Sequence, residues 1–486
     1  MCAVYPSNSR PTDLDSESQT RGAWRRRLVV VGVALSLPAL LWPWIVQLPP
    51  GGIEDDGYFY SQIAYNAGVH GRVSFDGIHP TDGFHLLWGY LLAAVSWLTA
   101  LASDSKTVHL YLHCAVTVAV LGICGDRFGR SWTDRALLVA LGMTGALPFE
   151  TPLLALFYLC FMTAASSRGF EGRSWPLVLF PLLMVLTRID AAPMAIVGAG
   201  VLLVHRRPRD FGRVVIGLVC GIVLQLVLMK ALGGEWFSVS STLKASRVGP
   251  LELPGVPPYL GRFVVLLVLG GVSGAAVVRH ARWTRDVGPL FLWLGAVAFT
   301  AFHFVFSLLR PWYYVPAFLV MVVALLWTQA SETARTRWRV AHALAVVGAA
   351  AIAFVAIEAA NSVRYRGESR RVRDFIEEVR RLVPATEPIY QVDGAGYTGF
   401  FTERRVVNGD GLVNTHEYAR RLLANDLAGY LDEEGISYII TNRRRRSPVV
   451  EIGGLVVETS EVEELARKPG DSVNRFTNFV LYRRLR

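Results

Sequence analysis

Residues 174–204 read SWPLVLFPLLMVLTRIDAAPMAIVGAGVLLV, which is two apolar runs, 174–187 and 191–204, separated only by Arg188, Ile189 and Asp190. Each run is shorter than the roughly 20 residues that a membrane-spanning helix usually needs. Charged side chains in so apolar a stretch are costly in a membrane and are kept where they serve a function or pair with each other. The stretch predicts two short membrane helices with a charged connection.

The composition of the whole chain agrees with this pattern. Of 486 residues, 52% are hydrophobic and 18% are charged, and the mean hydropathy is +0.36. An average soluble domain carries about 25% charged residues. These values exclude a disordered, fibrous or disulfide-scaffold protein and argue against a water-soluble enzyme. Basic cytoplasmic connections explain the net charge of +10, so we expect no nucleic-acid partner.

Further apolar runs indicate a polytopic membrane protein; they lie at 28–47, 108–124, 134–149, 152–166, 213–232, 259–278, 288–309, 313–328 and 339–357. One more run, 84–102, sets the topology, because its crossing would move every later connection to the other side. If it lies on the outer surface as a juxtamembrane helix, the arginine-rich connections all face the cytoplasm; these are 125–135, 166–173, 205–213, 279–287 and 329–338. We therefore predict a mainly α-helical protein with about 11 transmembrane helices and a cytoplasmic N-terminus.

The same reading divides the chain into domains. Residues 1–27 form a cytoplasmic tail, and 28–358 form a transmembrane domain whose first external loop is 48–107. Charges become frequent in 359–486 and long apolar runs stop, which predicts a small extracytoplasmic α/β domain. Its expected helices are 362–383 and 415–431, and its expected strands are 388–392, 405–407, 436–441, 449–457 and 479–482.

The first external loop contains the densest group of polar residues. It reads EDDGYFY at 54–60 and SFDGIHPTDGFH at 74–85. Carboxylates crowded at a membrane surface raise one another's pKa, and such a group can take a proton from a sugar hydroxyl near neutral pH. An acidic turn that simply keeps the loop in water is the alternative interpretation.

This loop resembles the first external loop of GT-C superfamily membrane glycosyltransferases, similar to aminoarabinose, protein-mannosyl and arabinofuranosyl transferases. Weaker resemblances lie at 186–190, 149–151, 310–316, 393–401 and 407–414. At 149–151 the chain departs from the family's element, since Pro148 and Phe149 replace Gly-Met. The resemblance implies a polyprenyl-phosphate sugar donor and a glycan, lipid or protein acceptor in the cell envelope. It also implies that Asp55 is the catalytic base and Asp56 its acidic neighbour.

Cations at the external ends of the spans are candidates for binding the donor phosphate; they are Arg188, Lys244, Arg247 and Arg310. A salt bridge from Arg188 to Asp190, a solvated loop around Lys244 and an interfacial aromatic belt after Arg310 are the alternatives. Candidate sugar- or acceptor-binding residues are Glu54, Tyr58, Tyr60, His79, Asp82, His85, Glu150, Asp190, Trp312 and Tyr313. Glu150 is equally compatible with a structural, hydrogen-bonded acid.

Two further possibilities stay open at the level of the sequence. The histidines and carboxylates of the first loop offer oxygen and nitrogen ligands for a divalent metal, but their spacing matches no specific motif. The sequence therefore identifies no cofactor, and a divalent metal stays an alternative. A polytopic transporter or lipid-linked glycan flippase would also use intramembrane charges, although repeated halves with broken helices are typical of transporters and no such repeat is visible. A non-catalytic scaffold would not explain acids and bases gathered at one face.

Overall fold

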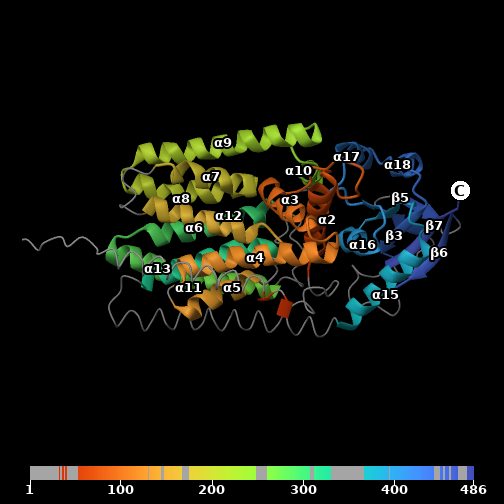
Figure 1. Ribbon diagram of the computed structural model, residues 1–486. Helices are drawn as coiled ribbons and strands as arrows, with labels where there is room; N and C mark the ends of the chain where they lie inside the picture. The colour runs from red at the N-terminus through yellow and green to blue at the C-terminus, as the bar shows by residue number, and fades with distance from the viewer. Residues whose placement is uncertain are drawn as a thin grey trace, which may run out of the picture.

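The structure is a computed structural model that describes residues 53–129, 131–143, 147–166, 174–247, 260–306, 311–329, 366–392, 394–442, 449–452, 455–458, 461–468 and 479–485, with isolated positions between 32 and 40. These residues are mostly helical and include a small sheet. Figure 1 shows a long helical bundle, with the C-terminal α/β domain at one of its ends.

The apolar runs that lie in the described residues form helices, as the sequence predicts: α3 (Leu86–Ala100), α4 (Lys106–Phe128), α5 (Trp132–Met143), α6 (Thr151–Ser166), α7 (Pro176–Thr187), α8 (Ala192–Val204), α9 (Pro208–Gly233), α11 (Leu260–Thr284), α12 (Gly288–Phe306) and α13 (Pro311–Gln329). The expected spans at 28–47 and 339–357 lie outside the described residues. By length and composition, α4 and α9 are the described helices that could cross a membrane; most of the others are shorter apolar helices.

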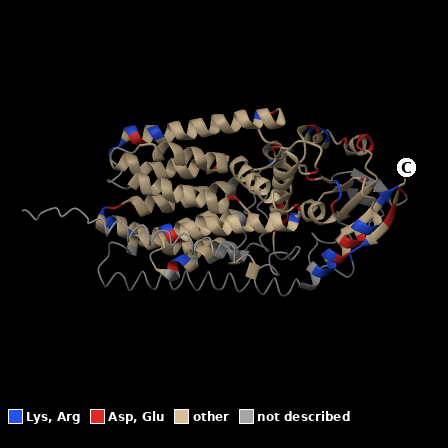
Figure 2. Cartoon of the chain, in the orientation of Figure 1, with Lys and Arg blue, Asp and Glu red and all other residues tan. Residues whose placement is uncertain are grey.

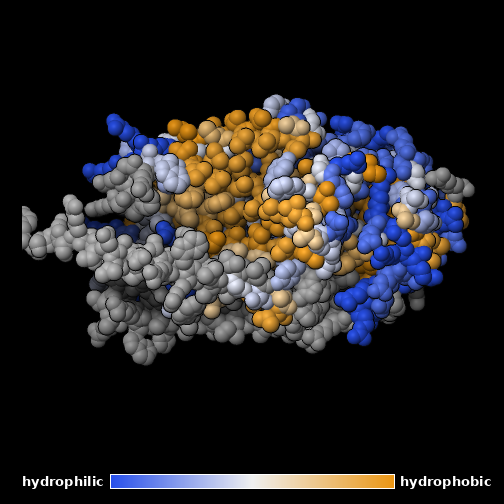
Figure 3. Space-filling model, in the orientation of Figure 1, coloured by the Kyte–Doolittle hydropathy of each residue, from blue (hydrophilic) through white to orange (hydrophobic). Residues whose placement is uncertain are grey.

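The outer face of α9 is apolar along its length. Ile216, Val219, Val223 and Val227 are each about half exposed, and their spacing of three or four residues places them on one side of the helix. Figure 3 shows the hydrophobic surface of the bundle between two more polar ends. An apolar surface of this kind is typical of contact with lipid or another protein.

The arginine-rich connections in the described part of the chain, at 125–129, 131–135, 205–213 and 279–287, lie towards the end of the bundle away from the C-terminal domain (Figure 2). Arg207 in the α8–α9 connection donates a hydrogen bond to the carbonyl of Ala165 near the end of α6, at 3.0 Å. Arg135 at the start of α5 pairs with Asp126 near the end of α4, at 3.3 Å. The first contact places the α8–α9 connection beside the end of α6, and the second joins the two helices on either side of the α4–α5 connection.

At the opposite end, α2 (Asp55–His70) and α3 pack closely against each other beside the C-terminal domain (Figure 1). A Cβ atom on Gly68 of α2 would lie 2.5 Å from the carbonyl oxygen of Ala93 in α3. Glycine is needed there because the two backbones meet without room for a side chain. The short helix α10 (Val239–Arg247) follows α9 at this end.

The C-terminal domain contains a five-stranded sheet in the order β2-β1-β3-β7-β6, in which β1 pairs in parallel with β2 and β3, and β7 pairs antiparallel with β3 and β6. Its strands are β1 (Ile389–Gln391), β2 (Val406–Asn408), β3 (Tyr438–Asn442), β6 (Val462–Arg467) and β7 (Phe479–Arg484), and a separate hairpin joins β4 (Val449–Ile452) and β5 (Leu455–Glu458). Its helices are α15 (Arg366–Leu382), α16 (Ala395–Thr402), α17 (His416–Leu423) and α18 (Leu427–Glu433).

The sequence-based expectations for this domain are mostly confirmed, with three differences. The helix expected at 415–431 is interrupted after Leu423, and the strand-like run at 449–457 is a hairpin of two strands. Helix α16 and strand β6 were not predicted. The α/β character itself agrees with the expectation.

The first loop and the C-terminal domain share one hydrophobic core. Tyr58 and Phe59 from α2 and Phe75 from the first loop belong to the same buried cluster as Phe400 of α16 and Phe479 of β7. The ring of Tyr58 lies 5.5 Å from that of Phe400. This shared core fixes the C-terminal domain against the loop that carries the acidic motif.

Candidate functional site

A buried ion-pair cluster lies where α7 ends. The backbone leaves the helix at Arg188 in an extended conformation, which turns its side chain to neighbouring chain segments. Its Nε and Nη2 donate to the two carboxylate oxygens of Asp190 at 2.9 and 2.6 Å, and its Nη1 donates to Glu150. Only 3% of the Arg188 side chain and 1% of the Glu150 side chain are exposed. One guanidinium therefore neutralises one of two buried carboxylates.

Aromatic and imidazole rings surround this cluster. His85 Nε2 lies 3.5 Å from Glu150, and His303 Nε2 of α12 lies 3.3 Å from Asp190. The ring of Tyr313 in α13 stacks on His303, with centroids 4.1 Å apart, and lies 4.7 Å from the Arg188 guanidinium. His303 was not predicted as a site residue, although a lone histidine in the apolar run 288–309 is a usable signal.

Burial has a clear electrostatic effect on His85, which precedes α3. It lowers the pKa of this imidazole to about 4, although Glu150 opposes the change. The imidazole is therefore neutral near pH 7, and it can donate a hydrogen bond to a hydroxyl or accept one from it. Tyr60 of α2 stacks on His85 with centroids 6.3 Å apart, which connects the cluster to the helix that carries the acidic motif.

The predicted cations are placed unequally. Lys244 of α10 has an exposed side chain, and its positive charge contributes a small lowering of the pKa of His85. Arg188 lies in the cluster, but all three of its guanidinium nitrogens are hydrogen-bonded to carboxylates. Arg310 and the side chains of Arg247 and Trp312 lie outside the described residues.

The two aspartates at the start of α2 serve different faces of the helix. Asp55 Oδ1 accepts a hydrogen bond of 3.0 Å from the backbone N–H of Tyr397 in α16, so this carboxylate faces the C-terminal domain. Asp56 lies one helical turn before Tyr60 and acts electrostatically on it, which places both on the same face. The ring of Tyr58 in α2 packs against the rings of Phe400 and Phe401 in α16. Glu54 is the N-cap residue of α2, and its side chain makes no capping hydrogen bond.

Two other predicted ligands, Asp82 and His79, lie at the junction with the C-terminal domain. Asp82 is 1% exposed and accepts hydrogen bonds from the backbone N–H of Val239, at 2.9 Å, and from His416 Nε2, at 3.0 Å. His416 is not among the site residues that the sequence predicts, yet it contacts this buried acid. Both contacts of Asp82 join segments of the chain to each other.

The junction around His79 is a network of charges. His79 Nδ1 donates to Asp76 at 2.8 Å, and Arg405 pairs with both Asp76 and Glu434. Burial opposes ionisation of Asp76, but hydrogen bonds from His79 and from backbone N–H groups outweigh it and lower the pKa to about 2. The hydrogen bond to Asp76 raises the pKa of His79. The network joins the first loop to the end of α18.

The histidines of the first loop do not converge with its acids on a single point. His79 contacts Asp76, His85 contacts Glu150, and Asp82 contacts His416. Within the part of the chain that the structure describes, no group of three or more His, Cys, Asp or Glu side chains is arranged to hold a metal ion.

Searches against known proteins add nothing to the resemblance: no protein-family model matches this chain, and no curated protein is significantly similar to it. The functional argument therefore depends on the motif residues and on their arrangement in space.

Proposed function

We propose that this protein is a membrane glycosyltransferase that moves a sugar from a polyprenyl-phosphate donor to a cell-envelope acceptor. The observation that carries the proposal is the cluster of Glu150, Arg188 and Asp190, together with Asp56 on the face of α2 that turns to Tyr60. Charges buried at the end of a membrane bundle are expensive and mark substrate sites by default.

The proposed membrane arrangement has about 11 spans, a cytoplasmic N-terminus and an extracytoplasmic C-terminal domain. The apolar outer face of α9 and the arginine-rich connections at the far end of the bundle support it. Helix α3 lies beside α2 at the domain end (Figure 1), which favours a juxtamembrane position. Reporter enzymes fused after residues 104 and 358 test this: both should be active only outside the cytoplasm, and a cytoplasmic signal after 358 would reject the arrangement.

In the proposed reaction, a hydroxyl oxygen of the acceptor forms a bond to the anomeric carbon of the sugar. The bond from that carbon to the phosphate oxygen breaks, and the lipid phosphate leaves with the bonding electrons. A carboxylate of the first loop takes the hydroxyl proton. Lys244 stabilises the negative charge on the departing phosphate, together with Arg247 and Arg310 from the sequence prediction.

The cluster around Arg188 has a positioning role in this scheme. The guanidinium of Arg188 is already hydrogen-bonded to Asp190 and Glu150, so Arg188 holds these two acids in place. Lys244 binds the phosphate instead. Glu150, Asp190, His85 and Tyr313 then offer hydrogen bonds and a ring face to the sugar.

The choice between Asp55 and Asp56 as base is open to experiment. The family resemblance favours Asp55, whereas its hydrogen bond from Tyr397 directs it to the C-terminal domain. We propose Asp56 as the base, because it shares a helix face with Tyr60. General-base catalysis contributes typically about 10²–10⁴-fold, so Asp56→Asn should lower turnover by roughly that factor while donor binding persists.

The measurement is transfer from a panel of polyprenyl-phosphate sugars by the full chain reconstituted in liposomes. Asp126→Asn, which removes a carboxylate from the far end of the bundle, is the matched control and should keep full activity. Loss in Asp55→Asn alone would return the base to Asp55. Full activity in both variants would reject a first-loop base, and lipid translocation without any transfer would favour a flippase.

A further inference from the structure

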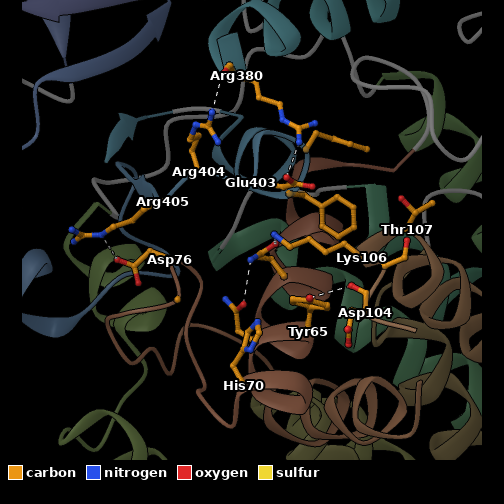
Figure 4. A pocket seen from close by; sticks show the side chains of 16 residues that line it. Tyr65, His70, Asp76, Asp104, Lys106, Thr107, Arg380, Glu403, Arg404 and Arg405 are labelled. Atoms are coloured by element: carbon orange, nitrogen blue, oxygen red, sulfur yellow. Dashed lines mark hydrogen bonds and ion pairs between the residues drawn. The ribbon is translucent and has the colours of Figure 1, made fainter. Parts of the chain in front are cut away.

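A polar cleft of about 680 Å³ lies between the two domains, separate from the buried cluster. Its walls come from α2, the start of α4, the first loop and the segment of the C-terminal domain around residues 400–405 (Figure 4). The volume falls within the range of about 300–1,000 Å³ that is typical of small-ligand sites. Gln62 in its wall lies six residues after Asp56, which is about 9 Å along α2.

Lys106 projects into this cleft between aromatic rings. Its Nζ lies 5.5 Å from the ring centroid of Tyr65 in α2 and 5.9 Å from that of Phe400 in α16. It donates one hydrogen bond, of 3.1 Å, to Gln62 Oε1. An ammonium group has three donors, and the described part of the chain occupies one of them.

The charges that line the cleft are only partly neutralised. Arg380 pairs with Glu403 at 2.8 Å, and Arg405 pairs with Asp76 at 3.3 Å. Arg404 donates to two backbone carbonyls. Among the described residues, neither Lys106 nor Arg404 has a carboxylate within ion-pair distance, although Glu403 acts on Lys106 electrostatically and Asp104 lies at the rim.

The chemistry of the walls suits a charged carbohydrate. Phe401 is partly exposed and provides apolar surface for the ring of a sugar, whereas Tyr65 and Phe400 are buried. His70 and Thr107 add groups that hydrogen-bond hydroxyls. The cationic groups favour an anion, and a partly buried lysine without a carboxylate partner is a strong donor to one. A neutral ligand would leave the Lys106 ammonium without compensation for its lost hydration.

We propose that this cleft binds an acidic saccharide, with the carboxylate of a uronic-acid residue on Lys106 and the sugar ring against Phe401. The site is a binding site in its own right and does not depend on which first-loop acid is the base. Because the test measures binding without a lipid donor, its failure is distinguishable from a failure of the proposed transfer reaction.

The test is isothermal titration calorimetry on the full chain in nanodiscs, with uronic-acid oligosaccharides and their methyl esters as probes. The acids should bind at least about tenfold more tightly than the neutral esters, and added salt should weaken them. A charged hydrogen bond contributes the equivalent of roughly 10- to 100-fold in affinity. Lys106→Met should cause that loss, and Lys106→Arg should retain part of the binding.

Lys230→Met is the matched control, because Lys230 also lies over an aromatic ring, 5.9 Å from the centroid of Trp236, but on α9. It should leave binding unchanged. Thr107→Trp, at an exposed position of the cleft wall, should block binding and serves if Lys106→Met does not fold. The proposal is overturned if no acidic oligosaccharide binds, if esters bind equally, if both cleft variants bind normally, or if inorganic phosphate competes as well as the saccharide.

Discussion

Two arginines, Arg188 and Arg405, each form ion pairs with two carboxylates, but in different surroundings. Arg188 lies between Glu150 and Asp190, and Arg405 lies between Asp76 and Glu434; histidines accompany both. The side chains of Arg188 and Glu150 are 3% and 1% exposed, whereas those of Arg405 and Glu434 are 20% and 24% exposed. The remaining partners differ less, since Asp190 is 18% exposed and Asp76 is 8% exposed. The difference is therefore the degree of burial and not the type of contact.

Burial changes what such an ion pair contributes. Taking charges out of water is so costly that a buried pair rarely adds net stability, yet removal of one partner leaves an uncompensated charge. A partly exposed pair gains and loses little, because water and salt screen it. A protein that keeps a buried cluster at one end of an apolar bundle has a reason other than stability, whereas the junction around Arg405 needs only to join the first loop to the C-terminal domain.

The largest expected effect comes from breaking each cluster in the same way. Arg188→Met should destabilise the protein by about 3–5 kcal/mol, because the buried Glu150 and the partly buried Asp190 lose their counter-ion. Arg405→Met should cost less, about 1–2 kcal/mol, because its pair with Glu434 is partly exposed and Asp76 keeps its hydrogen bonds from His79 and from backbone N–H groups. Thermal unfolding of the detergent-solubilised variants measures both. Equal losses would show that burial does not separate the two clusters.

The sequence indicates the buried cluster better than the junction. Arg188, Asp190 and Glu150 interrupt or border apolar runs, so their isolation in the sequence marks them. The junction gives no such signal, because His416 meets Asp82 and Arg405 meets Asp76 across more than 300 residues. No local pattern predicts a contact of that separation, so the sequence could not show that His79 and Asp82 join the first loop to other segments of the chain.

The fold shows the same division. Helices of the bundle follow directly from apolar runs, but α16 was missed because its sequence, AGYTGFFT, contains two glycines that disfavour a helix. The structure gives the reason for one of them: a Cβ atom on Gly396 would lie 2.4 Å from the backbone oxygen of Asp55. Strand β6, with the sequence VEELAR, was missed because glutamate, leucine and alanine favour helices.

An intermediate effect should come from this close approach of α16 to α2. Gly396→Ala should cost roughly 1–3 kcal/mol, because the new methyl group forces the two backbones apart. Gly212 in the first turns of α9 is the matched control, since nothing lies within 4 Å of its added Cβ atom. Gly212→Ala should be neutral or stabilise the protein by about 0.5–1 kcal/mol. If both variants unfold at the same temperature, the two helices are not in close contact.

The smallest effect should be the pH dependence of the junction. The hydrogen bond to Asp76 raises the pKa of His79 above its unfolded value of 6.5, so its contribution to stability is complete below pH 6.5 and is lost as the pH rises through the raised value. The pKa of Asp76 falls from 3.8 to about 2, so its contribution is present above pH 3.8 and is lost as the pH falls towards 2. Together they place the most stable junction between about pH 4 and 6.5.

Hydrogen exchange at the backbone amides of Ile78 and His79 can measure this, because both donate to Asp76 Oδ1, at 2.9 and 2.8 Å. Protection corrected for intrinsic exchange should be higher at pH 5.5 than at pH 8.5. The change should be modest, since 29% of the His79 side chain is exposed and Arg405 opposes its protonation. His79→Gln should abolish the difference, because glutamine keeps a hydrogen-bond donor but does not titrate in this range. A variant that retains the full pH dependence would assign it to another group and would leave the junction around Arg405 without a titrating member.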